Sequence, residues 1–215
     1  MSARWRLLGC RGCGSTIAEA VLVLAGIEYD REEINYEEAG PARDRLLALN
    51  PLGQVPTLVM PDGAVMTETA AIVLHVDELH PDAGLLPRPG DPRRRDALRW
   101  LVFFVAAIYP TFTYGDDPAK WAGAGGGEAL RASTNEHREK LWMQLDAAAA
   151  PTGPYFLGEH TSALDLYICV ATCWRPRRAW FLANAPRLHA IATRVEADPR
   201  LAALLSRELA VYPRD

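Results

Sequence analysis

The chain has 215 residues, of which 49% are hydrophobic, and it carries a formal net charge of -4. This composition suffices for a packed core, and without a basic excess neither nucleic acid nor an anionic membrane is favoured as a partner. No apolar run reaches the roughly 20 residues that span a bilayer, and the first residues lack a signal-peptide core, so we expect a cytoplasmic protein. Four cysteines are too few for a secreted disulfide framework.

The first 80 residues alternate between strand and helix patterns. A strand precedes a glycine-rich loop and a helix that closes at Gly26, and a hairpin turns at Pro61-Asp62-Gly63 before another helix opens at 67–69. The predicted order is β-α-β-α-β-β-α, with a right-handed first crossover. This order is that of a thioredoxin-like domain. Predicted strands lie at 5–8, 27–36, 57–60 and 64–66, and predicted helices follow residue 15, at 41–49, and from 67 to about 80.

The rest of the chain is predicted to be helical. Prolines and glycines crowd residues 81–92 without periodicity, so we take domain boundaries of 1–80, a linker at 81–92, and 93–215. Ser162 followed by Asp165 fits a capping box at a helix start, which assigns Asp165 to folding. Predicted helices cover 93–108, 128–150, 162 to about 174, 186–196 and 199–208, with a flexible loop at 123–127.

Two sequence segments carry a family resemblance. The run Asn50-Pro-Leu-Gly-Gln-Val-Pro-Thr-Leu58, followed by Glu68-Thr-Ala-Ala-Ile72, resembles the glutathione-binding segment of the cytosolic glutathione transferase superfamily. The resemblance covers essentially all 215 residues. It implies an α/β thioredoxin-like N-terminal domain followed by an all-α helical C-terminal domain, with glutathione as co-substrate and no metal. It also implies a homodimer, with the helix Thr69 to Leu79 offering one side of the contact.

The same resemblance implies roles for individual residues. Val55 would pair its backbone with the cysteinyl part of glutathione, next to a Pro56 that we predict to be cis, and Glu68 with Thr69 would hold the γ-glutamyl end. A helix N-terminus suits a carboxylate and a glutamate suits an ammonium, although Thr67 could simply cap the helix while Glu68 complements its dipole. The implied glutathione-binding residues are Gln54, Val55, Pro56, Glu68 and Thr69.

A transferase of this kind needs a group that holds the glutathione sulfur as thiolate. No tyrosine lies between residues 1 and 28, which favours a bacterial serine- or cysteine-type member over a tyrosine-type one. In the serine and cysteine classes of this family the reactive residue lies roughly a dozen to fourteen positions before the glycine that closes the first helix, so the resemblance implies Cys13 as the first candidate. Ser15 is the second candidate and could equally cap the helix, and the backbone N–H groups of 12–15 are a third possibility.

Cys10 and Cys13 form a Cys-x-x-Cys pair, which supports an alternative function in glutathione-dependent thiol–disulfide exchange through Cys13 with Cys10. Against it, the glycine-rich loop could leave Cys10 too far away at the strand end. A non-catalytic binding module is a third alternative. Cys169 and Cys173 have helical spacing and are expected to pack in the core, so no metal site is predicted.

The pocket for a small, largely apolar electrophile is expected between the two domains. Its predicted lining lies around a helix break at Pro110, and ordinary core packing of these rings is the alternative. Three arginines at 175, 177 and 178 suggest a solvated basic helix end rather than a site for an acidic substrate. The predicted pocket residues are Tyr109, Phe112 and Tyr114, with Trp121 beside them.

Overall fold

The protein, a computed structural model that describes residues 4–213, contains one four-stranded mixed sheet. The strand order is β2-β1-β3-β4, with β1 and β2 parallel and β3 antiparallel to both of its neighbours. The predicted β-α-β-α-β-β-α order is confirmed, and each strand is shorter than or close to its predicted length. The strands are β1 Trp5–Gly9, β2 Tyr29–Glu33, β3 Thr57–Val59 and β4 Val65–Met66.

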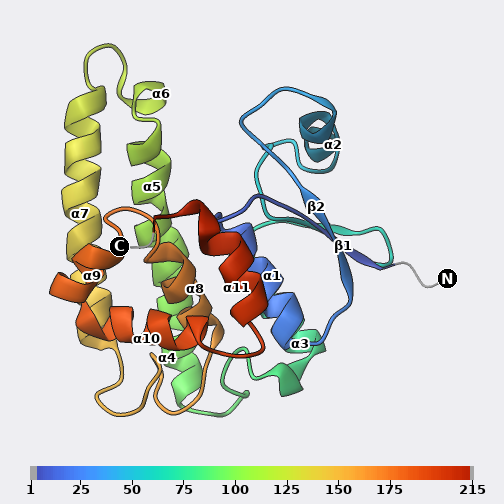
Figure 1. Cartoon of the computed structure of the whole chain (residues 1–215), viewed down its shortest axis with the longest axis vertical. Coiled ribbons are helices and arrows are strands. Elements are labelled where there is room, and N and C mark those ends of the chain that lie inside the picture. The colour runs from blue at the N-terminus through green and yellow to red at the C-terminus, as the bar shows by residue number, and fades with distance from the viewer. Residues whose placement is uncertain (1–3, 214–215) are drawn as a thin grey trace.

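Helices cover both faces of this sheet (Figure 1). Successive side chains of a strand point to opposite faces, so Leu7 joins the main core beneath α1 (Ser15–Leu24) and α3 (Thr69–Leu79). Leu8 joins a small cluster beneath α2 (Pro41–Leu49) with Leu46. The main core continues without interruption from α1 into the helical half of the chain, which fixes the position of the α1 N-terminus relative to that half.

The helical half is built around α8 (Ala163–Ala171), whose nine residues are all buried. This helix packs against α1 on one side and against α10 on the other. The helices α5, α6 and α9 lie outside the predicted set, and the other boundaries move by a few residues. The remaining helices are α4 Arg93–Phe103, α5 Tyr109–Asp116, α6 Ala119–Ala122, α7 Gly127–Ala148, α9 Arg178–Asn184, α10 Pro186–Glu196 and α11 Ala202–Glu208.

The predicted helix break at Pro110 is wrong. A π-helical turn at Phe104–Ile108 carries α4 directly into α5, and Pro110 lies in the first turn of α5. A proline lacks the N–H that would bond one turn back, and a wider π turn accommodates that loss without ending the helix. The continuous run Arg93–Asp116 has the length and composition of a membrane span, yet its helices pack against α7 and α8.

Buried polar groups fasten the outer segments to this core. The Asp165 carboxylate accepts hydrogen bonds from the backbone N–H groups of Ser162 at 2.7 Å and Phe156 at 2.8 Å, which confirms the capping box and its structural role. Burial raises the pKa of Asp165 to about 6. At the other end of the chain, α11 is held against α1 through the buried carboxylate of Glu19, which accepts from Arg207 at 2.7 Å.

Candidate functional site

The N-termini of α1 and α3 meet the start of α5 at Gly14. A Cβ atom on Gly14 would lie 2.9 Å from the Tyr109 Oη and 3.4 Å from the Thr69 Oγ1, so only glycine permits this approach. Gly14 is the N-cap of α1 and Glu68 is the N-cap of α3, and neither helix has a side-chain cap. Free N–H groups and the positive ends of two helix dipoles therefore converge here, which favours a bound anion.

A rigid loop presents Val55 beside these helix ends. The Asn50 side chain and the Thr57 hydroxyl both donate to the Gln54 carbonyl, at 3.0 and 2.9 Å, and fix the loop. The Val55–Pro56 bond is cis, as predicted. Within residues 4–213, neither the N–H nor the C=O of Val55 has a hydrogen-bond partner. An unpaired donor and acceptor on one half-buried residue can accept an extended peptide as an added strand.

The first residues of α3 are shaped for a polar ligand. Glu68 is exposed and adopts φ 65° and ψ 107°, an uncommon conformation for a residue with a side chain, and Thr69 is buried beneath it. The Thr67 hydroxyl donates to the Glu68 carboxylate at 3.5 Å and does not cap the helix. The expectation that Thr67 is a simple cap is therefore wrong, because the N-cap position falls on Glu68.

The loop between β1 and α1 places the two cysteines in one turn. The Cys13 N–H donates to the Cys10 carbonyl at 3.3 Å, and the Cys13 Sγ lies 3.9 Å from the Tyr36 Oη. A side-chain hydrogen bond with the Cys10 thiol, together with burial, raises the pKa of the Cys13 thiol. The same hydrogen bond lowers the pKa of Cys10, and Arg31 adds to that effect. Cys13 is thus a neutral thiol at the α1 N-terminus.

The Ser15 side chain is buried and bonds the backbone of its own loop. Its side chain is 0% exposed, and its hydroxyl accepts from the Cys10 N–H at 3.0 Å and donates to the Cys10 carbonyl at 2.8 Å. Because its hydrogen is already donated, Ser15 has none left for a sulfur. It is not the helix cap either, since that position belongs to Gly14.

Residues from the far end of the chain clamp the same loop. The Gly12 carbonyl accepts from the Trp174 Nε1 at 2.7 Å and from the Tyr212 Oη at 2.9 Å. Gly12 has φ +70°, and a Cβ there would lie 2.7 Å from the Val211 Cγ2. Sequence reasoning missed Trp174, Tyr212 and Tyr36 as parts of this site, and no local motif points to them because they lie far along the chain from the loop.

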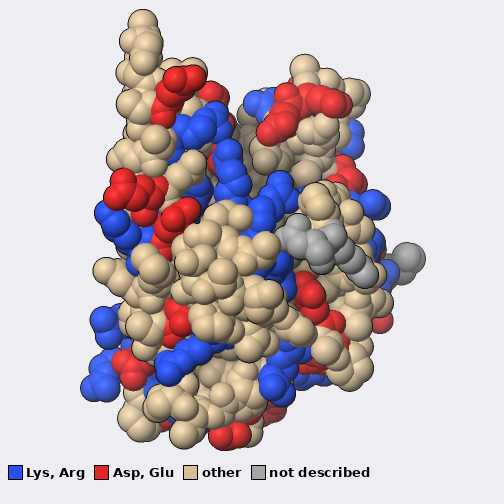
Figure 2. All heavy atoms as spheres, turned by 60° about the vertical axis from the view of Figure 1, so that its left-hand side comes forward, with Lys and Arg blue, Asp and Glu red and all other residues tan. Residues whose placement is uncertain are grey.

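The predicted aromatic pocket residues divide into two groups. Tyr109 and Phe112 both pack edge-on against Trp174, with ring centroids 5.4 and 5.2 Å away, next to the loop. Tyr114 instead packs against the exposed Trp121 at 5.1 Å, farther along α5. Figure 2 shows a notch between the lobe that carries α5 to α7 and the lobe that carries α2, with basic side chains along its walls.

A buried arginine lies behind Phe112. The Arg138 guanidinium carbon lies 4.2 Å from the Phe112 ring centroid, and the residue is 1% exposed. Its Nη2 bonds Asn135, while within the described residues its Nε and Nη1 have no partner. Burial lowers the pKa of Arg138 to about 10. Of the three predicted basic residues, Arg177 is exposed and lies over Tyr212, the partly exposed Arg175 pairs with Asp116, and the half-buried Arg178 pairs with Glu196 at the start of α9.

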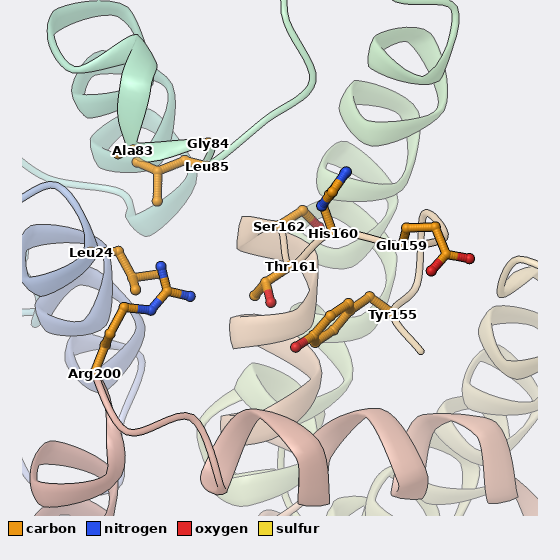
Figure 3. Close-up of a pocket in the computed structure, with 10 residues that line it drawn as sticks. All are labelled: Leu24, Ala83, Gly84, Leu85, Tyr155, Glu159, His160, Thr161, Ser162 and Arg200. Carbon is orange, nitrogen blue, oxygen red and sulfur yellow. The ribbon is translucent and has the colours of Figure 1, made fainter. Parts of the chain in front are cut away.

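A separate pocket of about 400 Å³ opens at the other end of α1 (Figure 3). Leu24, at the C-terminus of α1, lines it together with Leu85 from the linker and Ser162 from the start of α8. Since α1 rises about 1.5 Å per residue over its ten residues, this pocket is more than a turn away from Gly14 and does not belong to the site.

Comparisons with known proteins agree on one family. Residues 15–79 match the model of the glutathione S-transferase N-terminal domain. An uncharacterized GST-like protein, YncG, of Escherichia coli is 39% identical over 203 residues, 94% of this chain and 97% of the relative. A maleylacetoacetate isomerase of Rhizobium meliloti is 35% identical over 200 residues, 86% of this chain and 87% of that one.

Solved structures give the same result for the fold. A glutathione transferase from Methylococcus capsulatus has a TM-score of 0.79 at 27% identity, covering 95% of this chain and 98% of that one. A glutathione transferase homologue from Sulfitobacter, solved with bound glutathione, has a TM-score of 0.81 at 22% identity, covering 97% and 100%. The thioredoxin-like sheet domain followed by helices is therefore confirmed.

Proposed function

Since the chain belongs to the cytosolic glutathione transferase superfamily, we propose that it holds the glutathione thiolate at the N-terminus of α1 for attack on a small, largely apolar electrophile. Family membership supports a glutathione-dependent enzyme with glutathione as its ligand or co-substrate. The electrophile and the means of activating the sulfur are parts of the proposal.

The unpaired backbone of Val55 is the observation that carries the proposal. Glutathione is a short peptide that could bind as an added strand. Its cysteinyl N–H would donate to the free Val55 C=O, and its cysteinyl C=O would accept from the free Val55 N–H. Gln54, Val55 and Pro56 form the rigid loop that keeps this edge in place. The γ-glutamyl carboxylate would then lie at the N-terminus of α3, near Thr69, with its ammonium group at the exposed Glu68 carboxylate.

The sulfur of a peptide bound in this way would lie near the N-terminus of α1. Cys13 would donate there by turning its thiol hydrogen from Tyr36 and Cys10 toward the sulfur, and its raised pKa keeps that hydrogen in place at neutral pH. The Tyr109 hydroxyl, which has no partner within residues 4–213, is a second donor beside Gly14. A thiol is a weak donor, so the free N–H groups of α1 contribute to the same anion. Tyr109, Phe112 and Trp174 offer an apolar surface beside this point for the electrophile, with Tyr114 at its outer rim.

Glutathione binding is the first test. Titration calorimetry compares glutathione with an analogue in which an ester oxygen replaces the cysteinyl N–H. We expect the analogue to bind about tenfold more weakly, because it leaves the Val55 carbonyl unpaired. Equal affinities would contradict the Val55 pairing. Turnover of a chloronitrobenzene, measured in parallel, reports whether the bound glutathione is activated for conjugation.

A second candidate is isomerisation of an acidic unsaturated compound, such as the maleylacetoacetate in the name of the Rhizobium meliloti relative. The observation that favours it is the Arg138 guanidinium, two of whose nitrogens have no partner among residues 4–213. A substrate carboxylate would supply that partner once Phe112 moves aside, because Arg138 is 1% exposed in the free protein. Substituting Arg138→Met should then reduce isomerisation of maleylacetoacetate far more than conjugation of a neutral chloronitrobenzene, and equal reductions would contradict this candidate.

The protein is proposed to act as a cytoplasmic homodimer. Exposed apolar side chains on the successive helices α3 and α4 support this part: Leu74 on α3, and Leu98 and Val102 on α4. Such a surface is typical of a protein–protein contact. Light scattering at micromolar concentration should give about twice the 23.7 kDa chain mass, and a monomer mass would refute the dimer.

A further inference from the structure

The turn that carries Cys10 and Cys13 brings two thiols together next to the proposed glutathione site. The 3.3 Å hydrogen bond from the Cys13 N–H to the Cys10 carbonyl closes a four-residue turn. The first and last Cα atoms of such a turn lie within about 7 Å of each other. A disulfide spans Cα atoms roughly 4.4–6.8 Å apart, so the turn already has the dimensions that a disulfide needs. The expectation that Cys10 lies too far from Cys13 is wrong.

Both thiols are free and partly accessible, and the backbone around them is fixed. Ser15 bonds both the N–H and the C=O of Cys10, and Trp174 bonds the carbonyl of Gly12. The two thiols also differ chemically. Cys10 receives the hydrogen bond of Cys13 and the field of Arg31, which lower its pKa, whereas Cys13 is the more buried of the two and keeps its proton.

We propose that Cys10 and Cys13 form a redox-active dithiol that reduces disulfides containing glutathione, with Cys10 as the attacking residue and Cys13 as the resolving residue. This inference uses the proposed glutathione site to select the disulfide substrate. It adds a redox activity to conjugation, and it reverses the sequence-based assignment, in which Cys13 forms the mixed disulfide.

The reaction balances over two exchanges. The Cys10 thiolate attacks one sulfur of glutathione disulfide, forms a bond to it, and releases the other half as glutathione thiolate. Cys13 then passes its proton to that thiolate and attacks the Cys10 sulfur, which displaces the second glutathione as thiolate, to be protonated by solvent. The dithiol loses two electrons and becomes a disulfide, and the glutathione disulfide gains them and becomes two molecules of glutathione. A dithiol reductant, such as dithiothreitol, returns the enzyme to its reduced form by two further exchanges, so that the net reaction moves two electrons from that dithiol to glutathione disulfide.

The other two cysteines provide an internal control. Cys169 and Cys173 are both buried, and the Cys173 Sγ bonds the Cys169 carbonyl at 3.8 Å. Burial raises the pKa of each thiol. They are therefore expected to stay reduced under conditions that oxidise the turn.

The test equilibrates the whole protein in dithiothreitol redox buffers, alkylates the remaining thiols and identifies the modified peptides by mass spectrometry. We expect a disulfide that joins Cys10 to Cys13 to appear as the buffer becomes oxidising, with Cys169 and Cys173 alkylated throughout. A Cys169→Ser, Cys173→Ser double variant should behave as the wild type. A Cys10–Cys13 pair that stays reduced in the most oxidising buffer would overturn the inference.

Single variants with glutathione disulfide then assign the roles. Cys13→Ser should stop at a glutathione mixed disulfide on Cys10, and Cys10→Ser should form none and lose disulfide reduction. A mixed disulfide on Cys13 in the Cys10→Ser protein would overturn the assignment. Glutathione binding, measured by calorimetry, separates the two proposals. A wild type that fails to bind glutathione contradicts the transferase, whereas a dithiol that dithiothreitol buffers cannot oxidise contradicts this inference.

Discussion

The indole Nε1 of Trp174 donates a 2.7 Å hydrogen bond to the carbonyl oxygen of Gly12 and so ties the helical half of the chain to the loop that carries the cysteines. Trp174 also forms edge contacts with Tyr109 and Phe112. One side chain thus connects the proposed sulfur site to the proposed electrophile surface. Displacing it should affect both binding steps.

Replacing Trp174 by phenylalanine tests this connection. The ring contacts largely remain, but the hydrogen bond to Gly12 is lost, which should lower the free energy of unfolding by about 1 kcal/mol and reduce kcat/KM for a chloronitrobenzene. Trp121→Phe is a matched control, because the Trp121 Nε1 also bonds a backbone carbonyl, that of Thr113, at 3.1 Å, on an exposed part of α5. Equal losses of kcat/KM in the two variants would contradict a role for the hydrogen bond between Trp174 and Gly12.

Substitutions at Cys13 and Ser15 separate catalysis from folding. We expect Cys13→Ala to lower conjugation about 10²-fold, as when a single anion-stabilising donor is removed, and Cys13→Ser to retain more activity because a hydroxyl can donate. Ser15→Ala should instead lower the free energy of unfolding, since it leaves the Cys10 N–H without its partner. Conjugation rates measure the effect on catalysis, and urea titrations measure the effect on the free energy of unfolding. Wild-type conjugation in all three variants would leave the α1 backbone amides as the activating group.

Tyr109→Phe should not destabilise the protein. The Tyr109 Oη is buried and has no hydrogen-bond partner within residues 4–213, so its removal relieves a desolvation cost and should leave the free energy of unfolding unchanged or about 1 kcal/mol higher. We expect kcat/KM to fall roughly tenfold, because this hydroxyl faces the N-terminus of α1. A marked loss of stability would show that the hydroxyl already has a partner in the free protein.

Asp165 predicts a pH dependence of stability. Its pKa in the folded state, about 6, lies above its usual value near 3.9, so the native state holds the proton more tightly than the unfolded chain. The stabilisation from protonated Asp165 is fully present below about pH 4 and is lost as the pH rises through about 6. The free energy of unfolding should change by up to about 3 kcal/mol over this range.

Asp165→Asn should remove that slope in urea titrations between about pH 4 and 7, whatever its effect on overall stability. Asp198→Asn is the contrasting control. The hydrogen bond from Arg200 lowers the pKa of Asp198, so this group stabilises the protein at higher pH and loses its effect on acidification. If the unfolding free energies of wild type and Asp165→Asn change in parallel with pH, the raised pKa is wrong.

Removing the Glu19 carboxylate should loosen the C-terminal helix. Glu19 is 1% exposed and accepts from Arg31 at 3.1 Å, Arg207 at 2.7 Å and the Tyr29 hydroxyl at 2.8 Å. Glu19→Ala removes all three bonds and leaves Glu208 as the carboxylate that Arg31 and Arg207 share, and we expect a loss of about 2 kcal/mol with faster amide exchange in α11. Glu136→Ala, which removes an exposed ion pair with Lys140, should change stability little. Similar losses in both variants would contradict the special role of the buried carboxylate.

Much of the fold could be predicted because its signals are local. The turn at 61–63, the helix-closing Gly26 and the pair Ser162 and Asp165 each act within a few residues, where backbone preferences and caps determine the structure. The same holds for the cis bond before Pro56, which was predicted from a short motif. Pro110 was misjudged because a π turn upstream, which no sequence pattern marked, absorbed its missing N–H.

By itself, the sequence determined which residue types were available for the site, namely a Cys-x-x-Cys pair, a Val-Pro loop and a helix that opens at 67–69. The tertiary structure decided how those residues are used. In the folded chain the Ser15 hydroxyl bonds the Cys10 backbone, and Cys13 lies beside Tyr36. Trp174 and Tyr212 both donate to the Gly12 carbonyl. The physical reason is that hydrogen bonding and burial depend on which groups meet in space. Groups separated by much of the chain meet only after the two halves have packed on a common core.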